Sequence, residues 1–321
     1  MDGQAIVDRR RLRRKLSFWR VFALVVVVAA IAMLTYAALP GLRSSEQIAR
    51  ISITGLVQDD DDLIKLIDDA GGNEAVKALV ITISTPGGTT YGGERIHDAL
   101  LRAGEKKPVV ADVRTLAASA GYMIAASTDY IVAGESSIVG SIGVIFQYPQ
   151  LKELLDKIGV RMEEIKSSPM KAEPSPFHDA SPEAKAMIRA LVLDSYDWFV
   201  DLVAEGRRMD RAKVLALADG TIFTGRQGLA NGLVDELGGE AEIRAYLESR
   251  SVAPGLKIID WEPSRETGGL FLPRISGLLF ERLTGMPIQL SDELRELGGG
   301  KLFLDGLLSV WQFGHNDMKN D

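Results

Sequence analysis

The stretch PVVADVRTLAASAGYMIAAS, residues 108–127, changes from strand character to helix character around a single serine. Its first part, Pro108 to Val113, is an apolar run of the length typical of a buried strand. Ser119 follows among Ala and Gly neighbours, where a helix is expected to start. Small residues let a helix pack closely on a sheet, and a serine at such a place often only caps the helix. The stretch therefore leaves two interpretations of Ser119 open, a packing or capping residue and a reactive hydroxyl.

Strand and helix patterns alternate on both sides of this stretch. Strands are expected at residues 48–54, 78–83, 108–113, 130–133, 160–165, 221–223 and 256–261. Helices are expected at residues 59–69, 93–103, from 119 onward, and at 151–158, 181–208, 211–218, 225–231 and 240–251, with a Gly-punctuated turn at 139–144 and a Pro-rich loop at 167–180. This alternation predicts an α/β fold with a largely parallel sheet.

Two segments follow strands at the edge where such folds place their catalytic loops. They are STPGG, residues 84–88, and the turn that carries Ser119. The carboxyl ends of parallel strands meet at one edge of a sheet, and functional residues gather there. This placement favours the reactive interpretation of Ser119 over the packing one.

The composition excludes several classes of chemistry. The chain has 321 residues and 46% hydrophobic residues, enough to bury a large core. It has no cysteine, which excludes disulfides and cysteine catalysis, and only three histidines, His97, His178 and His315. No phosphate-binding GxxxxGK[ST] loop is present. We therefore expect neither a cofactor nor a metal ion.

The N-terminal residues have the pattern of a membrane anchor. Residues 1–20 carry a net charge of +5 and are expected to be a cytoplasmic basic segment. Residues 21–39 contain no charge, which predicts a transmembrane helix anchored in the lipid bilayer. Because the basic residues precede the span, the positive-inside rule places the body outside the cytoplasm, as in a bacterial inner (cell) membrane protein. A cleaved signal peptide is the alternative.

The rest of the chain is expected to form a catalytic domain and an extension. Residues 41–262 hold the α/β pattern, and residues 263–321 are a Gly-rich and apolar extension that either packs between subunits or lies on the membrane. Residues 21–321 carry a net charge of −12. So acidic a body argues against a nucleic-acid partner, because phosphate contacts need a basic surface.

A reactive serine needs a base, and the chain offers two kinds. His97 and His178 each precede an aspartate but lie in polar contexts typical of the surface. A lysine serves if burial lowers its pKa from about 10.4 toward neutrality. Lys171 is the best lysine, because the prolines and apolar residues of its loop are able to desolvate it. The other lysines of the region, Lys152, Lys157, Lys166 and Lys185, occupy ordinary amphipathic or strand-edge positions.

Together these motifs resemble the signal peptide peptidase A family. They are STPGG (84–88), AASAGY (117–122), GSIGV (140–144), the loop with Lys171, and TGRQGLANGLVDELGG (224–239). Their order matches, as does the separation of 52 residues between Ser119 and Lys171. The resemblance covers residues 46–250 and the anchor, and it is to the short, single-unit form of the family. It implies a ClpP/crotonase-like ββα superhelix and a membrane-anchored serine endopeptidase with a Ser-Lys dyad.

The resemblance also implies roles for individual residues. Ser119 matches the nucleophile and Lys171 the general base, while Ser141 matches the serine that orients the lysine. A backbone N–H of Gly87 or Gly88 would help to hold the oxyanion. The expected substrates are apolar peptides such as cleaved signal peptides. The family further implies a homo-oligomeric ring in which neighbouring subunits share active sites.

One residue departs from the family pattern. Ala120 stands where the family usually has Gly, which costs roughly 1–2 kcal/mol if that position needs a positive φ.

Three other functions compete with this interpretation. The first is that of crotonase-type acyl-CoA enzymes, which carry a run similar to GLVD (232–235) but lack the anchor and the Ser-Lys pair. The second competing function is a broader quality-control peptidase for membrane proteins, and the third is a catalytically weak anchored scaffold.

Overall fold

The computed structural model describes residues 15, 18–33, 45–263 and 308–310. The chain divides into two compact units, Met1–Gln47 and Ile48–Asp321. In the first unit, residues 18–33 are helical. Within the described part of this chain, no helix combines the length and apolarity needed to cross a membrane. Most of the expected basic segment (1–20), the end of the expected anchor (34–39), and residues 264–307 and 311–321 of the extension lie outside the described residues.

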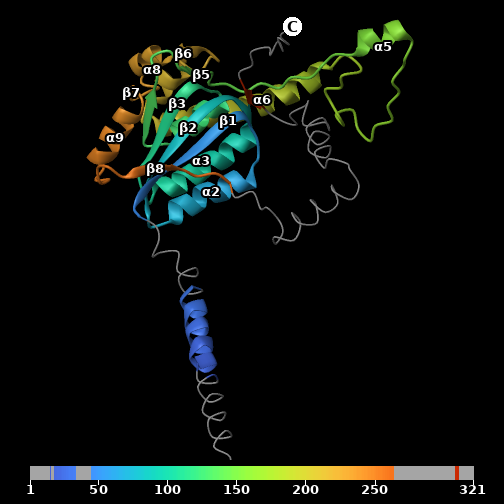
Figure 1. The fold of residues 1–321 in the computed structure, drawn as a ribbon. Coiled ribbons are helices and arrows are strands. Elements are labelled where there is room, and N and C mark those ends of the chain that lie inside the picture. Colours follow the sequence, from blue (N-terminus) through green and yellow to red (C-terminus); the bar gives the residue numbers. More distant parts are fainter. Residues whose placement is uncertain (1–14, 16–17, 34–44, 264–307, 311–321) are drawn as a thin grey trace, which may run out of the picture. The chain divides into compact units, whose positions relative to one another are not determined.

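The second unit is built on a mixed, largely parallel sheet (Figure 1). Its central strands follow the order β6-β5-β3-β2-β1-β8; β4 pairs with β3 and β7, and β9 pairs with β2. The strands are β1 (Gln47–Val57), β2 (Val76–Thr89), β3 (Val109–Ala118), β4 (Tyr130–Ala133), β5 (Ile138–Gly140), β6 (Ile222–Thr224), β7 (Glu236–Leu237), β8 (Lys257–Asp260) and β9 (Leu308–Val310). β3 runs parallel to β2, β4 and β5, while β5–β6 and β2–β9 are antiparallel.

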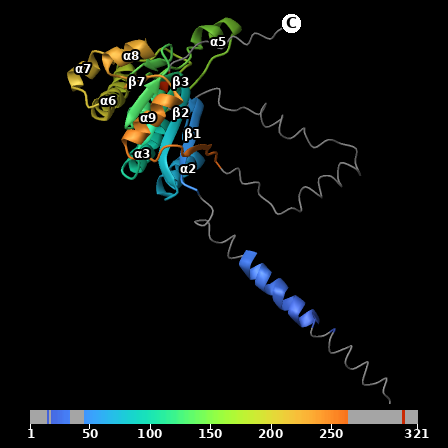
Figure 2. The same ribbon diagram turned by 60° about the vertical axis from the view of Figure 1, so that its left-hand side comes forward.

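Helices cover both faces of this sheet (Figures 1 and 2). They are α2 (Asp61–Gly72), α3 (Thr90–Gly104), α4 (Ala120–Ala126), α5 (Lys152–Ile158), α6 (Pro182–Gly206), α7 (Arg211–Leu215), α8 (Gly225–Asn231) and α9 (Glu240–Ser249). Leu79 and Ile81 of β2 belong to a core with residues of α2, α3, α4 and α6. Their neighbour Val80 points to the other face, where it packs with Ile243 and Leu247 of α9. Burial on both faces explains why β2 is a continuous apolar run.

Most of the elements expected from the sequence are present, which confirms the α/β interpretation. β4 and α8 have the predicted bounds, and the serine at the start of α6 is its N-cap, since the Ala184 amide donates to Ser181 Oγ at 3.1 Å. Three details differ. STPGG is the end of β2 and not a loop, the turn at 139–144 begins as β5, and residues 160–165 form no strand. Residues 160–165 are all exposed, and none of them pairs with a strand in the described part of the chain.

The glycine that ends α6 gives a test of this packing. A Cβ built on Gly206 would lie 2.0 Å from the carbonyl oxygen of Ala126 at the end of α4. Gly104 ends α3 in the same way, but a Cβ there meets nothing within 4 Å. We predict that Gly206→Ala lowers the free energy of unfolding by about 1–3 kcal/mol, because helix α6 has to move off α4.

Urea unfolding followed by circular dichroism measures the change. Gly104→Ala is the matched control and is expected to leave stability unchanged or to raise it by up to about 1 kcal/mol. Equal stability of the two variants would contradict the close contact between α6 and α4.

Candidate functional site

Ser119 lies in a sharp turn that the sheet register fixes. It directly follows β3, whose last residue, Ala118, pairs with Gly140 at the end of β5. The Ser119 amide donates to the Gly140 carbonyl oxygen at 2.9 Å, and its own carbonyl accepts from the Tyr122 amide at 2.8 Å. The residue is 1% exposed. Its backbone is therefore held from both sides, by the sheet and by the first turn of α4.

The backbone of Ser119 has a strained conformation. Its φ is 57° and its ψ is −118°, a region that non-glycine residues rarely adopt. Its side chain makes no capping hydrogen bond to α4, so the capping interpretation is wrong. Strained residues of this kind concentrate at active sites, and a serine on a tight strand-to-helix turn is the geometry of a nucleophile elbow.

The turn also shows whether alanine at position 120 strains the backbone. The positive φ falls on Ser119, whereas Ala120 is the first residue of α4 and has no positive φ. Alanine in place of glycine at this position therefore adds no backbone strain. Its amide is the first N–H of the helix and has no acceptor within it, which leaves it available as an oxyanion donor.

Ser141 lies beside Ser119 because of the same register. It follows Gly140 as Ser119 follows Ala118, and it too has a positive φ, of 52°. Its amide donates to the Thr221 carbonyl oxygen at 2.8 Å, and the residue is 8% exposed. Two strained serines thus end two neighbouring parallel strands.

A pocket of about 370 Å³ contains both serines. Its lining is largely apolar and comes from the turn of Ser119, the segment after β5, helix α6 and the segment before β6. The lining residues are Ser119, Ser141, Ile142, Gly143, Val144, Ile145, Val192, Leu193, Tyr196, Ala218, Asp219 and Gly220. None of these described lining residues is a lysine or a histidine. The described lining of this pocket therefore offers a hydroxyl next to an apolar chamber, without a lysine or histidine base.

The α6 residues of this pocket were not identified as site residues from the sequence. Val192 and Tyr196 fit the apolar stripe of a long helix, and a stripe alone does not distinguish a core face from a pocket wall. Tyr196 Oη donates to the Ala218 carbonyl oxygen at 2.9 Å, which fixes one wall of the pocket.

The two glycines at the end of β2 differ in what they offer. Gly87 has a φ of 106°, and its amide donates to Thr85 Oγ1 at 3.1 Å, so it is already engaged. Gly88 is required by close approach, since a Cβ there would lie 1.8 Å from the Val57 carbonyl oxygen. Because the Gly87 amide is engaged, Gly88 is the better candidate of the two for an oxyanion donor. The part played by Thr85 was missed from the sequence, although it stands inside STPGG.

Lys171 lies on an arm between β5 and α6 that carries α5 away from the sheet (Figures 1 and 2). Its side chain is exposed, and it does not line the pocket of Ser119. The expectation that its own loop would bury it is therefore wrong within one chain. Burial of the amine, which a lysine base needs, has to come from a surface outside this loop.

Lys166 organises the same arm. Its Nζ lies 2.5 Å from Glu164 Oε2 and 2.7 Å from Glu173 Oε1, and His178 Nε2 lies 3.2 Å from Glu173 Oε1. Glu164, Glu173 and His178 are close enough to one another to hold a metal ion. The ammonium group of Lys166 already supplies positive charge to both carboxylates, so the cluster is an ion-pair network that shapes the loop.

The histidines do not line the Ser119 pocket. His97 is mostly buried on α3, contrary to the expectation of a surface residue, and this burial lowers its pKa. His178 belongs to the network of the arm. A His–Asp triad with Ser119 is therefore not formed within the described part of the chain.

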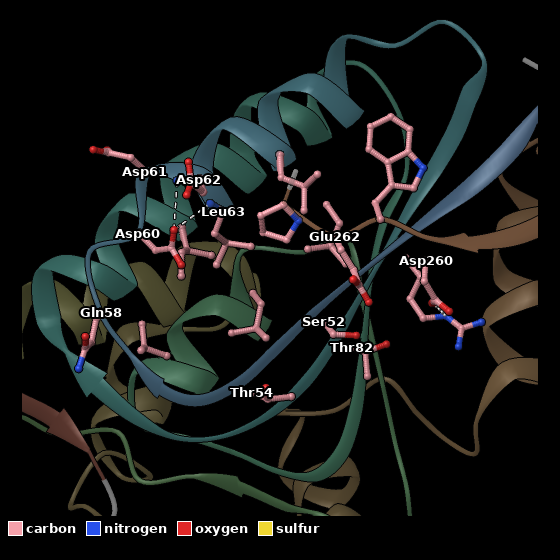
Figure 3. A pocket seen from close by; sticks show the side chains of 18 of the residues that line it. Ser52, Thr54, Gln58, Asp60, Asp61, Asp62, Leu63, Thr82, Asp260 and Glu262 are labelled. Carbon is pink, nitrogen blue, oxygen red and sulfur yellow. Dashed lines mark hydrogen bonds and ion pairs between the residues drawn. The ribbon is translucent and has the colours of Figure 1, made fainter. Parts of the chain in front are cut away.

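A larger pocket, of about 790 Å³, lies along β1 and the start of α2 (Figure 3). Several of its carboxylates have structural partners. Asp60 Oδ1 accepts from the amides of Asp62 and Leu63 as the N-cap of α2, as the dashed lines in Figure 3 show. Arg95 pairs with Asp59 and Asp61. None of the expected site residues lines this pocket, and the chemistry described above lies at Ser119.

The chain is similar to several known proteases. The model of peptidase family S49 matches residues 102–252, a segment that includes Ser119, Ser141 and Lys171. A protein from Synechocystis sp. named as a protease is 38% identical over 206 residues, which cover 63% of this chain and 73% of that protein. A protein from Enterococcus faecium named as a signal peptide peptidase is 31% identical over 233 residues, 68% of each chain. The solved structure of a membrane-bound stomatin-specific protease has a TM-score of 0.47 and 15% identity, and the alignment covers 68% of this chain and 99% of that one.

The strained turn gives a prediction that separates geometry from chemistry. Ser119→Gly and Ser119→Ala both remove the hydroxyl, but only glycine adopts the observed φ without strain. We expect Ser119→Gly to be more stable than Ser119→Ala by about 1 kcal/mol in urea unfolding. Ser127→Gly and Ser127→Ala, at a serine with a φ of −86°, form the control pair, in which alanine should not be the less stable variant. If alanine were at least as stable as glycine at position 119 too, as at position 127, the backbone of Ser119 would be unstrained.

The network around Lys166 predicts a response of the arm to acid. Its hydrogen bonds to Lys166 lower the pKa of Glu164 and of Glu173 below the ordinary 4.5. The ionised carboxylates of Glu164 and Glu173 therefore stabilise the loop at a pH above 4.5. This stabilisation is lost as the pH falls through their lowered pKa values. We expect the protection of the amides of residues 164–178 against hydrogen exchange, taken relative to the intrinsic rate at each pH, to fall as the pH falls below about 4.5.

Lys166→Met tests the origin of this response. The variant should exchange rapidly in the same residues at neutral pH and lose the acid response, while Lys157→Met on exposed α5 should behave as the unmodified chain. An unchanged exchange profile in Lys166→Met would contradict the role of the network.

Proposed function

The chain belongs to peptidase family S49, and we propose that it is a serine endopeptidase in which Ser119 attacks the peptide bond. The observation that carries this proposal is the strained, buried turn of Ser119 beside Ser141 in an apolar pocket. A hydroxyl held this way sits at a fixed position relative to a substrate carbonyl, so its attack loses little orientational entropy. The amides of Ala120 and Gly88 are the proposed donors to the oxyanion that forms, worth about 3–4 kcal/mol for one donor.

Lys171 is the proposed general base, supplied by a neighbouring copy of the chain. The pocket holds no lysine among its described lining residues, and Lys171 is exposed on an arm. Docked against the Ser119 pocket of a second copy, the amine would lose water and its pKa would fall toward neutrality. Lys171 then takes the Ser119 proton and returns it to the leaving amine, and a water molecule hydrolyses the acyl-enzyme. Ser141 is the proposed orienting partner of that amine.

The exposed apolar residues of the arm support such docking. Leu154 and Ile158 of α5 are 57% and 63% exposed, and Ile165 is fully exposed. Apolar surface of this kind is costly in water unless a partner covers it. A ring of identical chains, with each arm on the next body, would bury it and complete each site.

We propose apolar peptides, chiefly remnant signal peptides, as substrates. The walls that Val192, Leu193 and Ile142 provide suit an apolar side chain next to the scissile bond. The relative from Enterococcus faecium is named for signal peptides, and a bilayer anchor at residues 21–39 with the body outside the cytoplasm would bring the enzyme to them. Membrane fractionation tests the anchor, and a chain released by carbonate alone would contradict it. A broader quality-control peptidase is the second proposal, favoured by the unspecific character of an apolar pocket.

Single variants test the two catalytic residues. We expect Ser119→Ala and Lys171→Met each to lower kcat/KM on an apolar peptide by at least about 10³-fold, since each removes one part of the same chemical step. Lys65→Met, at an exposed lysine of α2, is the control and should retain full activity. Hydrolysis is followed by release of a fluorescent group. Full activity of Ser119→Ala would overturn the assignment.

Mixing the two inactive variants tests whether copies share a site. If Ser119 and Lys171 come from different chains, a 1:1 mixture assembled at random recovers about a quarter of the unmodified activity. If both come from one chain, the mixture stays inactive, because every chain lacks one of them. The second result would refute the shared site and leave the Ser119 assignment untouched.

A further inference from the structure

Thr85, inside the STPGG stretch, is fully buried near the end of β2. Its hydroxyl donates a hydrogen bond to the Gly55 carbonyl oxygen of β1 and accepts one from the Gly87 amide at 3.1 Å. A hydroxyl has one hydrogen to donate and two lone pairs that accept, so both bonds form at the same time. The Thr85 side chain therefore ties β1 to the backbone that leads into Gly88.

The methyl group and the carbonyl oxygen of Thr85 lie against the first turn of α4. A Cβ built on Gly121 would lie 2.6 Å from Thr85 Cγ2 and 3.1 Å from the Thr85 carbonyl oxygen. Gly121 is the second residue of α4 and stands two residues after Ser119. Only a glycine at this position lets the helix rest directly on Thr85.

An irregularity in the sheet brings these groups together. Ile83 of β2 pairs with Val113 of β3, whereas Thr85 pairs with Ala117, so two steps along β2 correspond to four along β3. Irregularities of this kind re-aim a strand and are common beside active sites. Regular pairing resumes at Thr85, which is where β2 meets the turn of Ser119.

We propose that Thr85 is a positioning residue that sets the gap between the two oxyanion donors, the amides of Gly88 and Ala120. This inference rests on the proposed function. The Thr85 hydroxyl holds Gly87, the residue before the first donor. The Thr85 methyl and carbonyl groups support Gly121, the residue after the second donor. Donors whose spacing is fixed in advance stabilise the transition state without reorganising during the reaction.

Two substitutions of Thr85 in the full-length chain separate its hydroxyl from its shape. Thr85→Val keeps the shape and removes the hydroxyl, while Thr85→Ser keeps the hydroxyl. We expect Thr85→Val to lower kcat on an apolar peptide about 10²-fold and to leave KM within about twofold, because the oxyanion exists only in the transition state. Thr85→Ser should restore kcat to within about threefold of the unmodified chain. Equal loss of kcat in both variants would overturn the role of the hydroxyl.

Thr128 provides the matched control for loss of a buried hydroxyl. It is 5% exposed, and its Oγ1 donates to the Ala125 carbonyl oxygen at 2.8 Å, at the far end of α4 from Ser119. Thr128→Val should lose stability in urea much as Thr85→Val does, since each leaves a backbone group without its partner. Its kcat should match the unmodified chain. A loss of kcat as large as that of Thr85→Val would show an effect of stability alone and overturn the inference.

A compensating pair of substitutions tests the gap itself. Gly121→Ala places a Cβ against the Thr85 methyl and should lower kcat about 10²-fold by moving α4 away from β2. Thr85→Ser removes that methyl, so the double variant should regain at least about tenfold in kcat over Gly121→Ala. A double variant no faster than Gly121→Ala would contradict a gap set by Thr85.

The same assays distinguish this inference from the proposed function. Full kcat in Thr85→Val, together with inactivity of Ser119→Ala, would overturn the positioning role and leave the proposed function standing. Inactivity of the unmodified chain on apolar peptides would overturn the proposed function and, with it, the role of Thr85.

Discussion

The register between β3 and β5 is the constraint on which the site depends. Pairing of Ala118 with Gly140 brings the next residue of each strand, Ser119 and Ser141, to one place. The hydrogen bond from the Ser119 amide to the Gly140 carbonyl oxygen then holds the turn in a conformation that costs energy locally. The buried residues of β2, β3 and α4 around it supply the stability that keeps the turn in place.

The end of β2 combines three requirements in a few residues. Gly87 takes a positive φ, Gly88 tolerates the approach of Val57, and Thr85 fixes the Gly87 amide through its hydroxyl. Together they leave a stretch of bare backbone beside Ser119. Such a stretch suits an oxyanion donor, and the same backbone pairs with β9.

The arm from β5 to α6 explains why one chain shows an incomplete site. Lys166 and its carboxylates give the loop a definite shape, yet they leave Lys171 in water and the apolar residues of α5 uncovered. A lysine base needs burial of its amine, and the arm does not provide that burial within one chain. In the proposed assembly, burial of this apolar surface would accompany burial of the proposed base.

The sequence by itself determined the alternating elements, the continuous apolar strand of β2, and the glycine and serine motifs at strand ends, because each depends on local periodicity and turn chemistry. The tertiary structure decided which of those motifs meet. It showed Ser119 beside Ser141, Lys171 away from both, Val192 and Tyr196 in the pocket wall, and β9 on β2. The physical reason is that strand register and crossovers join residues far apart along the chain, and these pairings leave no mark in local sequence patterns.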